Sequence, residues 1–375
     1  MATLTLIGDP FPDWEAPLHA AAARDLANAL AATAPRSCSA RFLLAKGSDE
    51  PEFTSPVLRT ERLPMRAGML PIMWQSGTTA RPLDGEFVHS MTPMVPLRAR
   101  GDDDGSQTSV MIPHSIAWEA AALLGNAQAR LFRAFTRRAV RLADVVLAPT
   151  HATARVLQHH YGDDLPVQVM QLAPPEEFTK PPQAQERRAA LGLPERYVVT
   201  TATTGPHGRL EWVLDALRAD PQLPPVVVID GLDPVAPARD HRDAKASDAP
   251  ESSIPADLQH RVHLFQPQEL ADVGTVLSGA SLLLQPQSFS GTGYLTLGAL
   301  SAAVPVLHAG HEATTEIALD GGITADSAEA FASEFSRLMR DDAALSRLAV
   351  LALDRSRGFG WRPVAWQLWE THANM

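Results

Sequence analysis

The chain has 375 residues, a formal net charge of -11 and one cysteine, Cys38. This length predicts two domains, and the acidic balance excludes the broad basic surface typical of nucleic-acid-binding proteins. One cysteine excludes an internal disulfide and a cysteine-based zinc site. Because the sequence also shows neither a signal peptide at its start nor a run of roughly 18 apolar residues, we expect a cytoplasmic protein.

Strand-like and helix-like runs alternate through the first half of the sequence. Apolar spacing and turn residues predict helices over residues 16–31, 127–142 and 151–160, and strands over 3–7, 86–89, 109–114, 144–149 and 167–172. This alternation is typical of a parallel sheet that is covered by helices on both faces.

A Pro-rich, polar segment over residues 173–182 reads as a linker, and the alternation restarts after it. Residues 233–258 read as an exposed loop. The predicted strands are 197–201, 225–230, 262–264, 280–285 and 305–307, and the predicted helices are 210–217, 271–277, 293–302, 328–340 and 343–357. Two doubly wound α/β domains, with a ligand cleft at the carboxyl ends of their strands, follow from this pattern.

Several short motifs carry a family resemblance that is strongest over residues 261–361 and weak before His89. They are Arg261-Val262-His263-Leu264-Phe265, Gly279-Ala280-Ser281, the run from Ser290 to Leu300, Pro305-Val306, Thr315-Glu316-Ile317 and Phe359-Gly360-Trp361, together with Ala143-Asp144-Val145-Val146 in the first half. The chain resembles the group-1, glycogen-synthase-like family of retaining GT-B glycosyltransferases.

The resemblance implies the GT-B fold, in which two Rossmann-like domains face a central cleft. It places an acceptor-side domain at 1–178, a nucleotide-sugar-side domain at 179–360, and a C-terminal helix at 361–375 that crosses back to the first domain. It also implies a hexosyltransferase that moves a sugar, with retention, from a nucleotide-diphosphate donor to a glycan, lipid or protein acceptor. No cofactor and no metal are expected.

The chain departs from the family at positions that bind the donor. The family's paired glutamates correspond to Ser290 and Gly298, and its Arg-Lys pair falls on His207 and Gly208, one residue before Arg209. The family's Gly-Gly loop appears as Pro17-Leu18, and proline has no N–H to offer a phosphate. A non-catalytic partner or binding subunit that keeps the fold is therefore the alternative to an enzyme.

The residues that remain define the candidate site. We expect His114 and Ser290 to orient the sugar and Arg209 to meet the diphosphate. The turn Gly291-Thr292-Gly293 opens a helix, so it either offers N–H groups to phosphate or serves only as a tight turn. Glu316 either contacts the nucleotide or caps a helix. His114 and His89 both follow strands, and a structural role is the alternative for each.

Two charged runs allow further interpretations. Asp102-Asp103-Asp104 lies between glycines and reads as a solvated loop rather than a metal site. Arg130, Arg133, Arg137 and Arg141 are spaced to share one helix face, which either is simply solvated or contacts anionic lipid from the inner face of the membrane. A GT-B phosphorylase would need a cofactor lysine in the second domain. The only lysine after residue 182 is Lys245, in the predicted exposed loop, so the sequence disfavours this alternative.

Overall fold

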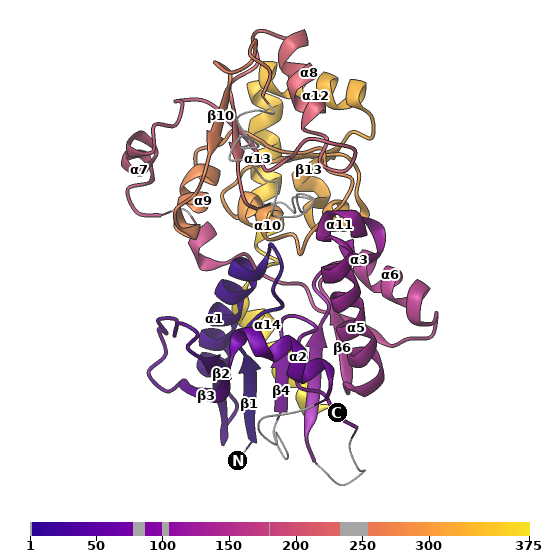
Figure 1. Cartoon of the computed structure of the whole chain (residues 1–375). Coiled ribbons are helices and arrows are strands. Elements are labelled where there is room, and N and C mark those ends of the chain that lie inside the picture. The colour runs from indigo at the N-terminus through magenta and orange to yellow at the C-terminus, as the bar shows by residue number, and fades with distance from the viewer. Residues whose placement is uncertain (1, 78–86, 100–104, 180, 233–253) are drawn as a thin grey trace. The chain divides into compact units, whose positions relative to one another are not determined.

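The computed structural model describes residues 2–77, 87–99, 105–179, 181–232 and 254–375 (Figure 1). The run Asp102-Asp103-Asp104, Lys245 and most of the predicted loop 233–258 lie outside these ranges. The chain divides into two compact units. Unit 1 comprises Met1–Ala121, Asn126–Ala173 and Gly360–Met375, and unit 2 comprises Ala122–Gly125 and Pro174–Phe359.

Unit 1 is built on a seven-stranded, all-parallel sheet of order β3-β2-β1-β4-β5-β6-β7. The residues of its central strands are mostly buried, as in parallel sheets that are covered on both faces. The strands are β1 (Ala2–Ile7), β2 (Cys38–Lys46), β3 (Arg59–Arg66), β4 (Phe87–Ser90), β5 (Gln107–Met111), β6 (Val145–Ala148) and β7 (Val167–Val169).

The helices of unit 1 include the last helix of the chain, α14, which packs against α1. The indole Nε1 of Trp369 donates to the carbonyl oxygen of Leu30 at 3.3 Å, and Gln367 donates to the carbonyl of Val169 at 3.1 Å. The helical elements are α1 (Ala16–Thr33), η1 (Ala67–Met69), α2 (Leu70–Gln75), α3 (Ile116–Glu119), α5 (Asn126–Leu142), α6 (His151–Tyr161) and α14 (Trp361–Ala373), while α4 (Ala121–Leu124) falls at the unit boundary.

Unit 2 is built on a six-stranded parallel sheet of order β10-β9-β8-β11-β12-β13. Valines and leucines of these strands pack with Phe331 and Phe335 of α12. The strands are β8 (Val198–Thr200), β9 (Val226–Ile229), β10 (Val262–Phe265), β11 (Leu283–Gln285), β12 (Val306–His308) and β13 (Gly322–Thr324). The helical elements are η2 (Glu176–Phe178), α7 (Ala184–Ala190), α8 (Leu210–Ala219), α9 (Leu270–Leu277), α10 (Tyr294–Ser301), α11 (Glu312–Ala318), η4 (Leu319–Gly321), α12 (Ala328–Arg340) and α13 (Asp342–Ser356).

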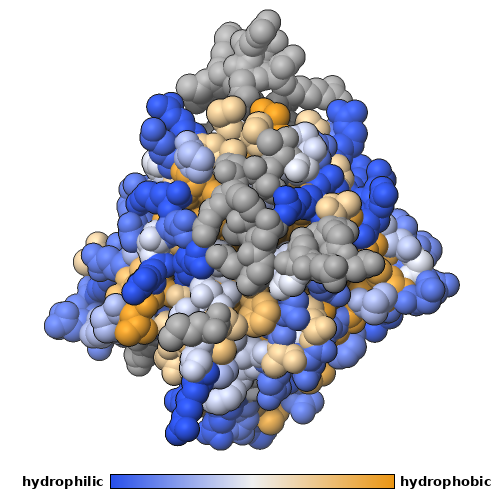
Figure 2. Space-filling view, turned by 90° about the horizontal axis from the view of Figure 1, so that it is seen from below, coloured by the Kyte–Doolittle hydropathy of each residue, from blue (hydrophilic) through white to orange (hydrophobic). Residues whose placement is uncertain are grey.

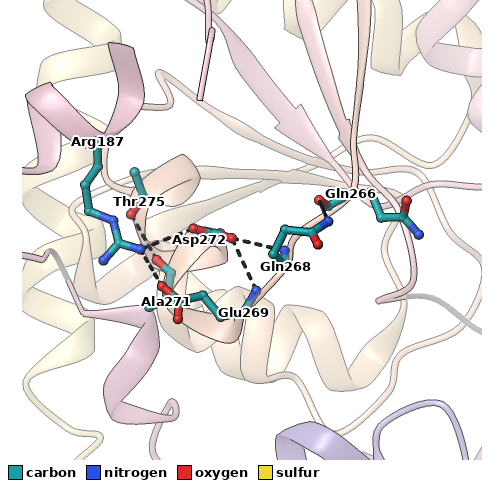
Figure 3. Close-up of polar contacts among 7 residues, drawn as sticks. All are labelled: Arg187, Gln266, Gln268, Glu269, Ala271, Asp272 and Thr275. Carbon is teal, nitrogen blue, oxygen red and sulfur yellow. Dashed lines mark hydrogen bonds and ion pairs between the residues drawn. The ribbon is translucent and has the colours of Figure 1, made fainter. Parts of the chain in front are cut away.

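A reciprocal capping box starts α9 (Figure 3). The buried carboxylate of Asp272 accepts from the backbone N–H of Gln268 at 3.0 Å and from that of Glu269 at 3.2 Å. Arg187 of α7 donates to Glu269 at 2.6 Å and to Asp272 at 3.2 Å. The box satisfies N–H groups that a helix start leaves free, and the arginine ties α7 to α9.

The predicted alternation of strands and helices is confirmed in both halves, with two parallel, Rossmann-like sheets. The sequence-based prediction missed β2, β3 and β13 and the helices α2, α3, α4, α7 and α11. Inside the predicted linker, Phe178 of η2 is fully buried and packs on Gly274 and Gly298, so this part of the segment belongs to a packed core. In the described part of the chain, no helix combines the length and apolarity needed to cross a membrane.

Candidate functional site at the strand ends

The strand order of unit 2 reverses between β8 and β11. From β8 the chain moves outward to β9 and β10, and it then returns to place β11 on the other side of β8. In open parallel sheets, ligands bind outside the carboxyl ends of the strands at such a reversal. The segments that follow these two strands, 201–209 and 286–293, contain five of the predicted site residues: Arg209, Ser290, Gly291, Thr292 and Gly293.

Hydrogen bonds connect the two segments directly. The backbone N–H of Ser288 donates to the carbonyl of His207 at 2.9 Å, and the Ser288 hydroxyl lies 2.9 Å from Nδ1 of the His207 ring. Next to them, Gln287 donates to the hydroxyl of Thr201 at 3.1 Å. The sequence-based prediction did not include His207 in the site. Its partner Ser288 lies 81 positions away, and no local sequence pattern indicates that the two residues pair.

Arg209 sits immediately before α8 in a left-handed backbone conformation, with φ of 56°. A non-glycine residue adopts this conformation at a cost of about 1 kcal/mol or more. Its guanidinium carbon lies 4.7 Å from the centre of the Trp212 ring, and Nη1 lies 3.5 Å from the carbonyl oxygen of Pro286. The side chain thus reaches the segment after β11.

The turn before α10 is tightly packed. Gly293 has φ of 92°, and a Cβ atom there would lie 2.3 Å from Cδ1 of Ile317. Thr292 is buried, and the Ser290 hydroxyl donates to the carbonyl of Gly291 at 3.1 Å. Packing and backbone conformation alone therefore require glycine at 293, whatever the turn binds.

Two further positions in unit 2 are explained by their surroundings. At Gly298, in the middle of α10, a Cβ atom would lie 2.8 Å from the Phe178 ring, so this position belongs to the core. Glu316 is in the second turn of α11, whose N-cap is His311. The alternative that Glu316 caps a helix is therefore wrong. The guanidinium of Arg355 donates to the backbone carbonyl of Glu316 at 3.0 Å.

In unit 1, His114 follows β5 and is fully buried. Its Nε2 lies 3.5 Å from Oδ2 of Asp13, and its ring stacks on Phe132 at 4.7 Å between centroids, with Trp14 at 4.9 Å. The other ring nitrogen, Nδ1, is buried and has no hydrogen-bond partner among the described residues. Asp13, which sequence reading missed, lies 101 positions from His114.

Two more ionisable groups extend this cluster. Nε2 of His19 lies 3.6 Å from the buried carboxylate of Glu15. Burial lowers the pKa of His19 to about 4, against the attraction of Asp13, and His114 lowers it further. His19 is thus neutral at neutral pH. Two imidazoles and two carboxylates meet beside β1 and β5, which is an arrangement suited to hydrogen-bonding hydroxyl groups or to moving a proton.

His89 has a structural environment. It is buried on β4, with Nδ1 2.8 Å from the hydroxyl of Ser109, which in turn lies 2.9 Å from Nε2 of His372 on α14. Burial lowers the pKa of His89 to about 3, and His372 adds to that shift. Of the two strand-end histidines, His114 is the one that lies in the cluster of ionisable groups.

Comparison with known proteins gives a consistent fold. No protein-family model matches the sequence, and no curated protein matches it significantly. Sucrose-phosphate synthase from Thermosynechococcus elongatus is similar in structure over 100% of this chain and 99% of its own, with a TM-score of 0.68 and 17% identity. HepE from Anabaena, solved in complex with UDP-glucose, matches over 100% of both chains with a TM-score of 0.67 and 15% identity.

A third similar structure is WaaG, a glycosyltransferase involved in lipopolysaccharide biosynthesis. It covers 97% of this chain and 98% of its own, with a TM-score of 0.60 and 15% identity. The chain has the GT-B fold. Full-length agreement with these structures confirms the fold class expected from the motifs, while identities this low establish similarity of fold alone.

Proposed function

We propose that the chain is a glycosyltransferase that uses a nucleotide-diphosphate sugar. Unit 2 binds the donor at the β8/β11 reversal, unit 1 is the acceptor-side domain, and its His114 orients the sugar. The sugar is transferred with retention, as in the family that the motifs resemble. The observation that carries the proposal is the meeting of Arg209 with the segment 286–293 at this reversal, in a fold shared with HepE.

The roles follow from what the reaction needs. A departing diphosphate carries charge that fixed cations and N–H groups must stabilise. Arg209 and the backbone of Gly291, Thr292 and Gly293 provide these groups, while Ser290 hydrogen-bonds the sugar and Glu316 contacts the nucleotide. This chemistry requires no metal ion or cofactor.

A thermal-shift experiment with UDP, GDP and ADP tests the proposal. A ligand that binds only the folded chain raises its melting temperature. We expect one nucleotide to give a clear shift that Arg209→Ala reduces, with Arg347→Ala on the exposed side of α13 as the matched control. If none of the three nucleotides at millimolar concentration shifts the melting temperature, the result would favour the second candidate function, a non-catalytic partner or binding subunit.

That second candidate is a non-catalytic partner or binding subunit, and one observation favours it. Gly298 stands at the position of the family's second glutamate. The side chains of Phe178 and Leu277 occupy the space next to it, so no polar side chain extends from this position toward a nucleotide ribose. A chain that binds a nucleotide sugar but transfers no sugar, and that activates another glycosyltransferase when mixed with it, would fit this candidate.

We also propose that the basic face of α5 meets anionic lipid at the cytoplasmic side of a membrane. Arg130, Arg137 and Arg141 are exposed and Arg133 is half-buried, while Phe132 and Phe135 on the opposite side are buried. Hydrophilic side chains cover much of the described surface that is seen from below in Figure 2. Flotation with vesicles of phosphatidylglycerol should recover the protein with the vesicles. The double variant Arg137→Gln, Arg141→Gln should be recovered in a smaller amount. Equal recovery of the unmodified chain and the double variant would mean that this face is only solvated.

A further inference from the structure

His207 is held in place at the β8/β11 reversal by two contacts with one residue. Its backbone carbonyl accepts from the N–H of Ser288 at 2.9 Å, and its Nδ1 lies 2.9 Å from the Ser288 hydroxyl. These contacts fix both the loop and the ring, and they use one of the two ring nitrogens. In the described part of the chain, the other nitrogen, Nε2, has no hydrogen-bond partner.

Arg209 brings a second basic side chain to the same short segment. Its guanidinium reaches the carbonyl of Pro286, two residues before the serine that holds His207. The stacking of Arg209 on Trp212, at 4.7 Å from the ring centroid, restricts the motion of this guanidinium. The imidazole and the guanidinium therefore both contact residues 286–288.

Few other charges surround the imidazole. The facing segment 286–293 contains no ionisable side chain, and neither does 201–206 on its own side. Glu211 of α8 accepts from the N–H of Gly205 at 2.9 Å, and Asp230 follows the neighbouring strand β9. On β12, burial lowers the pKa of His308 to about 4, so His308 is neutral near neutral pH.

We propose that His207 binds the diphosphate of the donor as an imidazolium, so that donor binding takes up a proton. The inference rests on the proposed function and goes beyond it by making donor affinity depend on pH. In the protonated ring, Nδ1–H donates to Ser288 and Nε2–H donates to a phosphate oxygen. The neutral ring either has its proton on Nδ1, so that Nε2 presents a lone pair that repels the phosphate, or has it on Nε2, so that Nδ1 accepts from the Ser288 hydroxyl and Nε2–H donates without a positive charge. Charge-assisted hydrogen bonds to phosphate are the stronger kind.

Calorimetric titration at several pH values between about 5.5 and 8.5, the range over which histidine ordinarily titrates, tests the inference. The probes are UDP-glucose, GDP-mannose and ADP-glucose, whose diphosphate diesters keep a constant charge over this range. We expect affinity to fall by about tenfold or more from the acidic to the basic end. Near neutral pH, two buffers of different ionisation enthalpy should reveal uptake of a fraction of one proton per ligand bound.

Three variants distinguish this role from a structural one. His207→Lys carries a constant charge, so it should bind with little pH dependence and without proton uptake. His207→Gln should bind weakly at every pH, and His263→Gln, an exposed histidine on β10, should behave as the unchanged chain. Melting temperatures without ligand establish that each variant is folded.

The unmodified chain alone already decides the question. Binding that is independent of pH and releases no buffer protons overturns the inference and leaves the proposed function standing. The same conclusion follows if His207→Gln binds with undiminished affinity. Failure of the unmodified chain to bind any of the three probes at any of these pH values overturns both the inference and the donor site.

Discussion

The hydroxyl of Ser109 lies between the imidazoles of His89 and His372, within 2.9 Å of a nitrogen of each. The ring of His372 also stacks on Phe87, with 5.2 Å between centroids. Burial lowers the pKa of His372 to about 4. His19 and His308 have pKa values lowered to about 4 for the same main reason.

These shifts predict that acid destabilises the fold. Each histidine stays neutral in the folded chain but takes up a proton in the unfolded chain below about pH 6.5. Stability is therefore full above that pH and falls as the pH drops toward 4, by at most about 1.4 kcal/mol per pH unit per histidine. Urea unfolding between about pH 7.5 and 5 should show this slope.

His372→Gln removes one of these groups and should make the slope shallower, while His263→Gln at an exposed position should not. An unchanged slope in His372→Gln would mean that His372 keeps an ordinary pKa in the folded chain.

Gly298 predicts the failure of a substitution that restores the family's residue. A side chain there meets Phe178 at 2.8 Å and Leu277 at 3.1 Å, counted from Cβ. Gly298→Glu should therefore cost more than about 2 kcal/mol by overpacking and by burial of a charge, without improving nucleotide binding. Thermal unfolding beside Ala343→Glu, at an exposed position of α13, measures the difference. A stable Gly298→Glu chain with tighter binding would place this position in an open site.

At the scale of elements, the capping box of α9 separates two kinds of polar contact. Asp272 is buried and satisfies two N–H groups, so Asp272→Ala should cost about 1–2 kcal/mol. Arg187 is exposed over 39% of its side chain, so water screens its ion pairs and Arg187→Ala should cost less than Asp272→Ala. Urea unfolding of both variants checks this order. A larger loss of unfolding free energy in Arg187→Ala than in Asp272→Ala would mean that the contact between α7 and α9 stabilises the fold more than the capping box does.

Elements were predictable where apolar periodicity was strong and missed where it was weak. The helix α5 (Asn126–Leu142) was expected within one residue, because its apolar positions recur at helical spacing. The edge strand β3 is mostly charged and polar, and β13 has three residues; neither shows an apolar pattern that sequence reading could detect. The linker reading followed from four prolines over residues 173–182, but it overlooked Phe178, which is buried against Gly274 and Gly298.

At the scale of the whole molecule, the motifs predicted the fold better than the site. Two parallel sheets follow from alternation that a single sequence displays. The contacts that define each candidate site join segments far apart in the chain, as with His207 and Ser288 or Asp13 and His114. Such pairs depend on strand order, and only the reversal between β8 and β11 brings Arg209 and Ser290 to one edge of the sheet.

Hydrogen exchange with and without the nucleotide sugar that binds most tightly tests the donor site most directly. Exchange reports local opening, so a ligand that contacts backbone and side chains of a loop should slow exchange there. We expect slowed exchange in residues 201–209 and 286–293 of unit 2, and loss of that protection in Arg209→Ala. Saturating ligand that leaves both segments unchanged, or that protects other segments alone, would contradict the placement of the donor site at the β8/β11 reversal.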